Sequence, residues 1–301
     1  MRTFLIIWLG QFASLIGSEM TNFAISIWAW EVTGQATPFS LILVATQVPK
    51  LLISPFAEVW VDRFNRKYLM VLGELVAGLS TIVLLTLVLS HQLQVWHLYI
   101  SGAVNGLFGY IQGLAHSASV SLLVPERHYT RAAAFEAALA SGSFILAPAA
   151  AGVMYAATGL QGIFAIDLIT FAISITTLSL VTIPHPAWSD GDVQSAADTA
   201  IQRFTFGARY LWQHPGLKAL LCFFLISNFI DGLCFTILFP MALSRLGNNT
   251  SILGTLASFF GIGGLLGGII LSVWGGPQRR IHGVLISNTL WKATLILLAL
   301  A

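Results

Sequence analysis

The sequence predicts an all-α polytopic membrane protein, in which a bundle of helices crosses a bilayer several times. Of its 301 residues, 56% are hydrophobic and only 9% are charged, whereas soluble domains carry about 25% charged residues. The mean hydropathy is +0.83. The apolar residues are gathered into long segments separated by short polar ones, and each long segment has the length of about 20 residues that a helix needs to cross a membrane.

Nine apolar segments satisfy this length and are the helices that we expect. In order, they are Phe4–Trp30, Pro38–Trp60, Tyr68–Leu89, Trp96–Ala118, Ala132–Ala157, Gly162–Ile183, Leu217–Leu243, Ile252–Trp274 and Gly283–Ala301. The first six form an N-terminal half at residues 1–183, and the last three form a partial C-terminal half at residues 217–301. The connection 184–216 starts with a polar, helix-breaking run and continues with alternating apolar and basic residues. It predicts a cytoplasmic linker with an amphipathic helix on the membrane surface.

The distribution of Lys and Arg predicts a cytoplasmic N-terminus. If the first helix starts on the inner side, almost all basic residues near helix ends fall on that side. The inner residues are Arg2, Arg63, Arg66, Lys67, Arg127, Arg131, Arg203, Arg209, Lys218, Arg279 and Arg280. The outer loops contain only Arg245, and an excess of positive charge is typical of cytoplasmic loops. The expected location is therefore the cell membrane, with several passes.

The composition and the motifs also exclude several functional classes. A net charge of +2, spread over separate loops, gives no footprint for nucleic acid. The two cysteines, Cys222 and Cys234, lie in one apolar segment without metal or disulfide spacing, so that no metal or other cofactor is expected. The sequence lacks H-E-x-x-H, G-x-S-x-G and a nucleotide-binding loop. These absences argue against an enzyme and against direct use of ATP.

Four polar residues in the first two segments are candidates for a coupling or substrate site. Glu19 and Lys50 lie near the middle of their segments, where an ionisable side chain is costly and marks a pathway or an ion pair. Protonation of Glu19 would break a Glu19–Lys50 pair, which suits proton coupling. A static salt bridge, or a Lys50 side chain that reaches the membrane surface, is an equal alternative. Asn22 and Gln47 lie three residues from these charges, and they either line a polar cavity or bond neighbouring helices.

Other ionisable residues have simpler interpretations. Glu74 and Glu136 lie one or two turns from the inner ends of their segments, where Arg127 or Arg131 can pair with them. A histidine side chain can change its charge near neutral pH, but a histidine placed like His116 is more often a packed side chain with its hydrogen bonds satisfied. We therefore expect structural roles for these three residues.

A dense charged loop separates the second and third segments. Residues 55–67 read PFAEVWVDRFNRK and include four charged residues within a span of six, namely Asp62, Arg63, Arg66 and Lys67. The loop resembles the signature G-x-L-a-D-R-x-G-R-K between helices 2 and 3 of the major facilitator superfamily, except that Glu58 and Asn65 replace its glycines. A simpler alternative is a charge cluster that only orients the helices.

The resemblance extends over essentially the whole chain. Residues 14–37, 123–135 and 206–220 are similar to the macrolide-efflux and enterobactin-exporter branch of that superfamily. The family implies twelve helices in two related halves, joined by a long cytoplasmic linker. About nine are expected here, so the chain is either truncated or a variant that needs a partner chain to supply the missing helices.

The resemblance also implies roles for residues in other segments. Helices 1 and 7 are related in this family and border its central cavity, so that Asp231 and Asn228 are the counterpart of the Glu19 site. Asp62 helps to hold the inner gate of such transporters, through a helix that this chain lacks. Asp167, close to the outer end of its segment, is a weaker candidate for the site.

The fifth segment contains a further motif of the family. Residues 142–152 read GSFILAPAAAG and resemble the antiporter motif G-x-x-x-G-P-x-x-G-G. Gly142, Pro148 and Gly152 would form a hinge, because proline bends a helix and small residues let helices approach closely. Ordinary tight packing explains the same residues equally well.

The expected function is that of a secondary transporter working by alternating access. The branch implies proton-coupled efflux of an amphiphilic organic molecule, such as a drug, a macrolide or a siderophore. Phe23, Trp28 and Phe235 are candidates for the cavity wall. The expected partners are the lipid bilayer, the small-molecule substrate and protons. The alternatives are an uptake carrier and a truncated remnant or subunit that does not transport alone.

Overall fold

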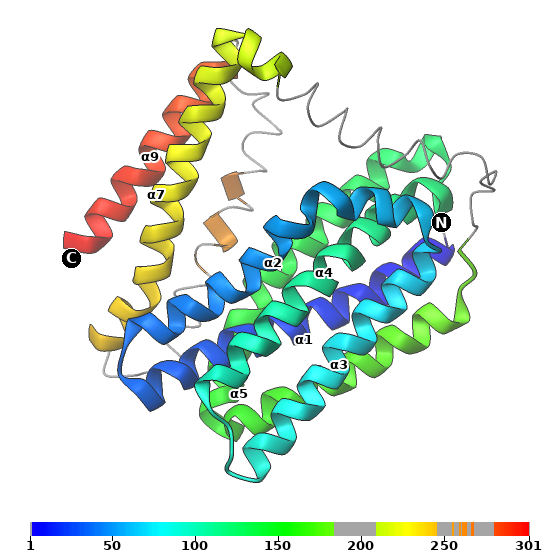
Figure 1. The fold of residues 1–301 in the computed structure, drawn as a ribbon, viewed down its shortest axis with the longest axis vertical. Helices are drawn as coiled ribbons and strands as arrows, with labels where there is room; N and C mark the ends of the chain where they lie inside the picture. The colour runs from blue at the N-terminus through cyan, green and yellow to red at the C-terminus, as the bar shows by residue number, and fades with distance from the viewer. Residues whose placement is uncertain are drawn as a thin grey trace.

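The computed structural model describes residues 2–183, 209–245 and 280–300, together with a few positions between 255 and 267. Every element in these ranges is a helix, which confirms the predicted all-α class. Helices α1 to α5 pack together in one bundle, and α7 and α9 form a pair beside it (Figure 1). The site described below lies inside the bundle, so its packing decides which polar residues meet.

The first four helices contain the first four predicted segments. They are α1 (Arg2–Thr33), α2 (Ala36–Arg63), α3 (Arg66–Leu89) and α4 (Val95–Leu123). Gly34 ends α1 in the left-handed region, with φ +63°, and its N–H donates to the Trp30 carbonyl at 2.7 Å. Asn65 caps the start of α3, because its side chain accepts a hydrogen bond from the Lys67 amide. Asn65 therefore has a structural use where the family signature has glycine.

The predicted fifth and sixth helices form one element, α5 (Tyr129–Leu180), which follows the short η1 helix (Glu126–His128). Gly159 has φ 64° and ψ −165° and divides α5 into a first arm, 129–158, and a second arm, 160–180. Glycine adopts this conformation because it lacks a Cβ. The two predicted helices, Ala132–Ala157 and Gly162–Ile183, are therefore present as the two arms, and a single non-helical glycine joins them.

The bundle is held together mainly by the packing of α1 along α5. α4 packs against both α2 and α3, and α3 also contacts α5. Ile27 of α1 and Ile163 and Phe164 of α5 are almost fully buried in the same core. Gly17 lets α1 approach the second arm of α5, since a Cβ there would collide with the Thr170 side chain. This close approach places α1 directly against a polar part of α5.

The second half is represented by α7 (Pro215–Arg245) and α9 (Arg280–Leu300). These helices correspond to the predicted segments Leu217–Leu243 and Gly283–Ala301, and α7 contacts both α9 and α2. Most of the predicted segment Ile252–Trp274 and residues 184–208 of the connection lie outside the described residues. The division into two halves and a linker stays a prediction.

Five of the described helices are long and apolar enough to cross a membrane. These spans are Thr3–Thr33, Ala36–Glu58, Arg66–Leu89, Arg131–Leu180 and Pro215–Leu238. Many large apolar side chains point away from the bundle, for example Leu51 and Leu52, which are 71% and 73% exposed. Such a surface is unfavourable in water and suits contact with lipid. The architecture is that of a multi-pass membrane protein.

Candidate functional site: a polar cavity in the helical bundle

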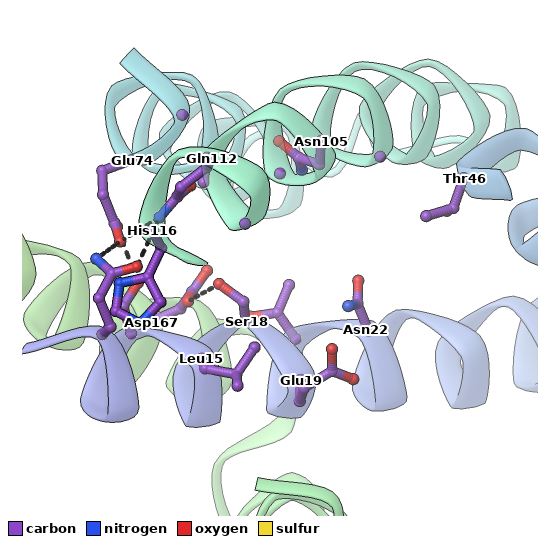
Figure 2. Close-up of a pocket in the computed structure, with 18 of the residues that line it drawn as sticks. Leu15, Ser18, Glu19, Asn22, Thr46, Glu74, Asn105, Gln112, His116 and Asp167 are labelled. Carbon is purple, nitrogen blue, oxygen red and sulfur yellow. Dashed lines mark hydrogen bonds between the residues drawn. The ribbon is translucent and has the colours of Figure 1, made fainter. Parts of the chain in front are cut away.

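A cavity of about 420 Å³ lies inside the bundle. Its wall is formed by α1, α2, α3, α4 and both arms of α5, and Figure 2 shows α1 and α4 on opposite sides of it. The polar and charged lining residues are Gln11, Ser14, Ser18, Glu19, Thr21, Asn22, Thr46, Lys50, Glu74, Thr81, Asn105, Gln112, His116, Ser117, Glu136 and Asp167. A concave site with convergent polar groups is the natural place for a ligand.

Glu74 of α3 is the best-connected carboxylate of the cavity, and it is only 1% exposed. Its Oε1 accepts three hydrogen bonds of 2.8 Å, from Gln11 Nε2, Gln112 Nε2 and Ser174 Oγ. Its Oε2 accepts a fourth from Ser14 Oγ at 2.9 Å. Neutral donors from α1, α4 and α5 therefore surround this group, and both of its oxygens accept hydrogen bonds.

Asp167, on the second arm of α5, is also buried but has fewer hydrogen bonds. Its side chain is 6% exposed. Thr81 donates to Oδ2 at 2.7 Å, while the Ser18 hydroxyl is 3.4 Å from Oδ1 (Figure 2). The second distance is long for an O–H···O hydrogen bond. No basic side chain among the described residues forms an ion pair with Asp167. The group is thus less completely satisfied than Glu74.

Arg131 forms no ion pair with Glu74 or Glu136, and the side chain of Arg127 lies outside the described residues. Glu74 has the neutral donors described above, and Glu136 pairs with His116 at an Nε2–Oε1 distance of 3.0 Å. Nδ1 of His116 is buried and has no hydrogen-bond partner among the described residues. His116 is therefore not the fully satisfied packing residue that we expect from the sequence. Both carboxylates line the cavity.

The structure brings together three of the four candidates from the first two helices. Glu19, Asn22 and Lys50 all line the cavity. Glu19 and Lys50 attract each other electrostatically, but these two described residues do not form a direct ion pair. Gln47 is exposed and does not line the cavity, where Thr46 takes its place. Because successive residues on a helix point in different directions, only one of the two can face inward.

Carboxyl side chains outnumber basic side chains in the lining of the cavity. Four carboxylates line it, namely Glu19, Glu74, Glu136 and Asp167. Lys50 is the one lysine or arginine among the described lining residues, and His116 can add at most a second positive charge. A concave site lined by one sign of charge concentrates ions of the opposite sign. The cavity is therefore suited to a cation.

The candidates on α7 lie apart from this cavity. Neither Asp231 nor Asn228 is among its lining residues. Oδ1 of Asp231 is buried without a hydrogen-bond partner among the described residues. Lys292 of α9 is engaged elsewhere, because it donates to Ser227 at 3.0 Å and to Asn288 at 2.6 Å. The structure does not join Asp231 and Asn228 to the Glu19 site.

The charged loop between α2 and α3 fastens the ends of other helices. Arg66 donates to the Ala118 carbonyl of α4 at 2.8 Å, and Lys67 donates to the Val181 carbonyl at the end of α5 at 2.6 Å. Asp62 lies 3.9 Å from Arg66. Basic side chains near helix C-termini are stabilising, by about 0.3–1 kcal/mol each. The loop therefore holds α3, α4 and α5 together at one end of the bundle, beyond any role in orientation.

The small residues of the predicted hinge are tightly packed. Gly142, Pro148 and Gly152 all lie in the first arm of α5. A Cβ on Gly142 would lie 3.1 Å from the Phe12 ring of α1, and Gly152 is buried. These contacts agree with close packing of α1 and α5, and a hinge movement stays a prediction.

A stripe of polar residues along one face of α1 could have predicted which side of this helix faces the cavity. Residues spaced by three or four positions share one face of a helix, and the stripe consists of Gln11, Ser14, Ser18 and Thr21. Glu19 stands out in the sequence instead, because an ionisable side chain in the middle of an apolar segment is costly. Phe23 and Trp28 pack against the core between α1 and α5 rather than lining the cavity, and the Phe235 side chain lies outside the described residues.

Comparison with known proteins places the chain in a family. Residues 7–301 match the family model described as Major Facilitator Superfamily. The chain is 32% identical over 280 residues to macrolide efflux protein A of Streptococcus pyogenes, with 92% of this chain and 68% of that protein covered. It is 31% identical over 250 residues to the protein of the same name from Enterococcus faecalis, with 82% and 76% covered.

Two further similarities are more distant. The MFS-type transporter YkuC of Bacillus subtilis is 25% identical over 311 residues, with 99% of this chain and 70% of that protein covered. A crystal structure of a bacterial homologue of the iron transporter ferroportin in an inward-facing state has a TM-score of 0.46 and 17% identity, with 99% and 90% covered. The family match over nearly the whole chain agrees with the helical bundle and its apolar surface. The chain belongs to the Major Facilitator Superfamily and is a multi-pass membrane transporter rather than an enzyme.

Proposed function

We propose that this transporter exports an amphiphilic organic cation by alternating access, in exchange for protons. The observation that carries the proposal is the excess of carboxylates over basic residues in the cavity. Apolar side chains such as Leu15 and Leu139 also line it, and they suit the apolar part of such a substrate. The relatives named for macrolide efflux support export as the direction and a large organic molecule as the substrate class.

Glu19 is the residue to which we assign proton coupling. It is exposed to the cavity, whereas Glu74 and Asp167 are buried. When Glu19 is ionised, its negative charge attracts both Lys50 and a positively charged substrate. When the cavity opens outward, a proton on Glu19 removes this attraction and releases the substrate. The protonated carrier then returns and loses its proton to the cytoplasm, so that one carboxylate exchanges a substrate for a proton.

The orientation that export requires places the N-terminus and the α2–α3 loop in the cytoplasm of the cell. Arg63 ends α2 and Arg66 and Lys67 begin α3 on either side of this loop, while the connections at residues 34–35 and 90–94 contain neither Lys nor Arg. The difference agrees with the excess of positive charge on cytoplasmic loops. An N-terminal epitope tag that antibodies reach only after the cells are permeabilised would support this orientation.

The first experiment compares the accumulation of a cationic dye and of a macrolide in cells that produce this chain. Glu19→Gln keeps the size of the side chain but removes its ionisation. Glu58→Gln is the matched control, because Glu58 is exposed on α2 and does not line the cavity. We expect lower accumulation with the wild-type chain and with Glu58→Gln, and loss of this effect with Glu19→Gln or a protonophore.

The direction and the coupling are tested in everted membrane vesicles with an acidified interior. Addition of the substrate is expected to raise the internal pH, because protons leave as the substrate enters. The proposal would be contradicted if the wild-type chain reaches the membrane but the change in internal pH equals that of vesicles from cells without the chain. Substrate entry into intact cells against a gradient would instead identify an uptake carrier.

A subunit that transports only with a partner chain is the second candidate function. The exposed apolar surface of α7 favours it, since Leu225 and Phe229 are 67% and 66% exposed. Helices of a partner could cover this surface, although lipid could also do so. Transport that appears only when the last three helices of a full-length relative are produced in the same cell would support the subunit. Transport by the chain alone would exclude it.

A further inference from the structure

Asp167 lies in a cluster of oxygen atoms from three helices. Thr81 of α3 donates to Oδ2 at 2.7 Å, and Ser18 of α1 is 3.4 Å from Oδ1. Thr21 is one turn further along α1, and its hydroxyl is near enough to interact with the same carboxylate, although the two do not form a hydrogen bond of good geometry. All four residues line the cavity. Gly17 makes the cluster possible, because a Cβ there would lie 2.9 Å from Asp167 Oδ1.

The hydroxyl of Thr21 indicates that the cluster is incomplete as it stands. Thr21 is only 8% exposed, and its Oγ1 has no hydrogen-bond partner among the described residues. A buried polar atom without a partner costs about 1–3 kcal/mol, so such atoms are rare unless something binds them. A cation that is coordinated by oxygen atoms could bind to the Thr21 hydroxyl and the Asp167 carboxylate together.

The charge of the cluster also lacks compensation. No Lys or Arg among the described residues forms an ion pair with Asp167, and the negative charge of Glu74 acts on it from nearby. Glu74 cannot relieve this charge, because it is itself a carboxylate, and its own partners are neutral donors. Burial of an uncompensated carboxylate is expensive. The cluster therefore needs a positive charge, which either a cation or a proton on Asp167 would supply.

We propose that the carboxylate of Asp167 and the hydroxyls of Ser18, Thr21 and Thr81 bind a monovalent alkali cation of the sodium type. Hard cations prefer oxygen ligands, and these hydroxyls can turn their lone pairs toward a cation. A single carboxylate matches a single positive charge. The described residues contain no group of three or more His, Cys, Asp or Glu side chains that would suit a transition metal.

The cation site uses a different carboxylate from the proton-coupling position at Glu19. Figure 2 shows Asp167 beside Ser18 and close to Glu74, whereas Glu19 and Asn22 lie further from Asp167. Binding of the cation joins α1, α3 and the second arm of α5, and it does not require that the chain transports anything. A link between this ion and export would rest on the proposed function, but the ion binding itself does not.

The test measures the thermal unfolding midpoint of the purified full-length chain in detergent, by tryptophan fluorescence. Sodium chloride is titrated against choline chloride at equal ionic strength. A ligand that binds only the folded state raises the midpoint in a saturable way. We expect a saturable rise with sodium and none with choline. If both salts act equally, or if the midpoint responds to pH but not to sodium, the proposal is wrong.

Two variants locate the effect. Asp167→Asn is expected to abolish the sodium response. Thr21→Val removes an unpartnered hydroxyl, so the fold is kept without sodium, and the sodium concentration at half-effect rises by about tenfold or more. Thr46→Val is the matched control in the same cavity, because the Thr46 hydroxyl bonds the Ile42 carbonyl of its own helix. Its sodium response stays that of the wild type.

Thr21→Val keeps the test decisive even if Asp167→Asn does not fold. An unchanged half-effect concentration in Thr21→Val, or an equal change in Thr46→Val, would overturn the assignment of these ligands. Because the measurement involves no transport, it can fail while the export proposal holds, and it can succeed while export fails.

Discussion

The regions around Glu74 and Asp167 lie in the same cavity and contain one buried carboxylate each, but the two carboxylates differ in the hydrogen bonds that they accept. Glu74 accepts four hydrogen bonds of 2.8–2.9 Å, from three other helices. Asp167 has one short hydrogen bond and one long one, beside an unpartnered hydroxyl. A fully satisfied buried charge holds a structure together, whereas a partly satisfied one leaves a place for a ligand. Burial alone does not distinguish the two.

Glu74→Ala is expected to have the largest effect on stability. It removes the common acceptor of Gln11, Gln112, Ser14 and Ser174, and it leaves a cavity in the core. We expect a loss of about 3–5 kcal/mol in the free energy of unfolding, measured as a lower thermal midpoint and poor recovery from detergent. Glu58→Ala, at an exposed position, should change stability by less than about 0.5 kcal/mol. A loss below about 1 kcal/mol for Glu74→Ala would remove the proposed contrast.

Gly17→Ala tests whether the close approach of α1 and α5 shapes the Asp167 region. The added Cβ would collide with Thr170 and press on Asp167, so we expect a loss of about 1–3 kcal/mol. Gly109→Ala is the matched control on α4, where an added Cβ meets no atom within 4 Å. It should be neutral or stabilising by up to about 1 kcal/mol, because alanine favours helix. Equal effects of the two changes would contradict the packing argument.

Asp167→Asn tests whether the second buried carboxylate contributes less to stability than Glu74. Without sodium, we expect a change in the free energy of unfolding of about 1 kcal/mol or less, in either direction. The amide oxygen can still accept a hydrogen bond from Thr81, and loss of the charge removes its repulsion by Glu74. Thermal unfolding in choline buffer measures the change. A destabilisation as large as that of Glu74→Ala would show that both carboxylates are structural.

The smallest expected effects are those of substitutions near Glu19, and they compare a residue that lines the cavity with one that does not. Asn22 lines the cavity and Gln47 does not. Asn22→Ala should weaken the apparent affinity for the exported substrate by about fivefold, which corresponds to about 1 kcal/mol. Gln47→Ala should leave both export and stability unchanged within about 0.5 kcal/mol. Concentration-dependent efflux measures both variants, and a stronger effect at Gln47 would relocate the site to the surface of α2.

The sequence was sufficient for the fold and for part of the site. The apolar segments predicted α1 to α4, α7 and α9 to within a few residues, and the ionisable positions Glu19 and Lys50 do line the cavity. It was not sufficient for the neighbours of each side chain. Glu136 meets His116, and Glu74 meets Ser174, a residue 100 positions away. Spacing along one helix cannot show which other helix will supply a partner.

The sequence by itself determined that this protein is a bundle of membrane helices of the Major Facilitator Superfamily. The reason is local: a segment in lipid must satisfy its backbone hydrogen bonds internally, so a long apolar segment forms a helix whatever surrounds it. The tertiary structure decided which buried carboxylate is satisfied and which is not. That outcome depends on how each helix is rotated and how closely it packs, as the contact of Gly17 with the second arm of α5 shows. These properties arise only when the helices meet.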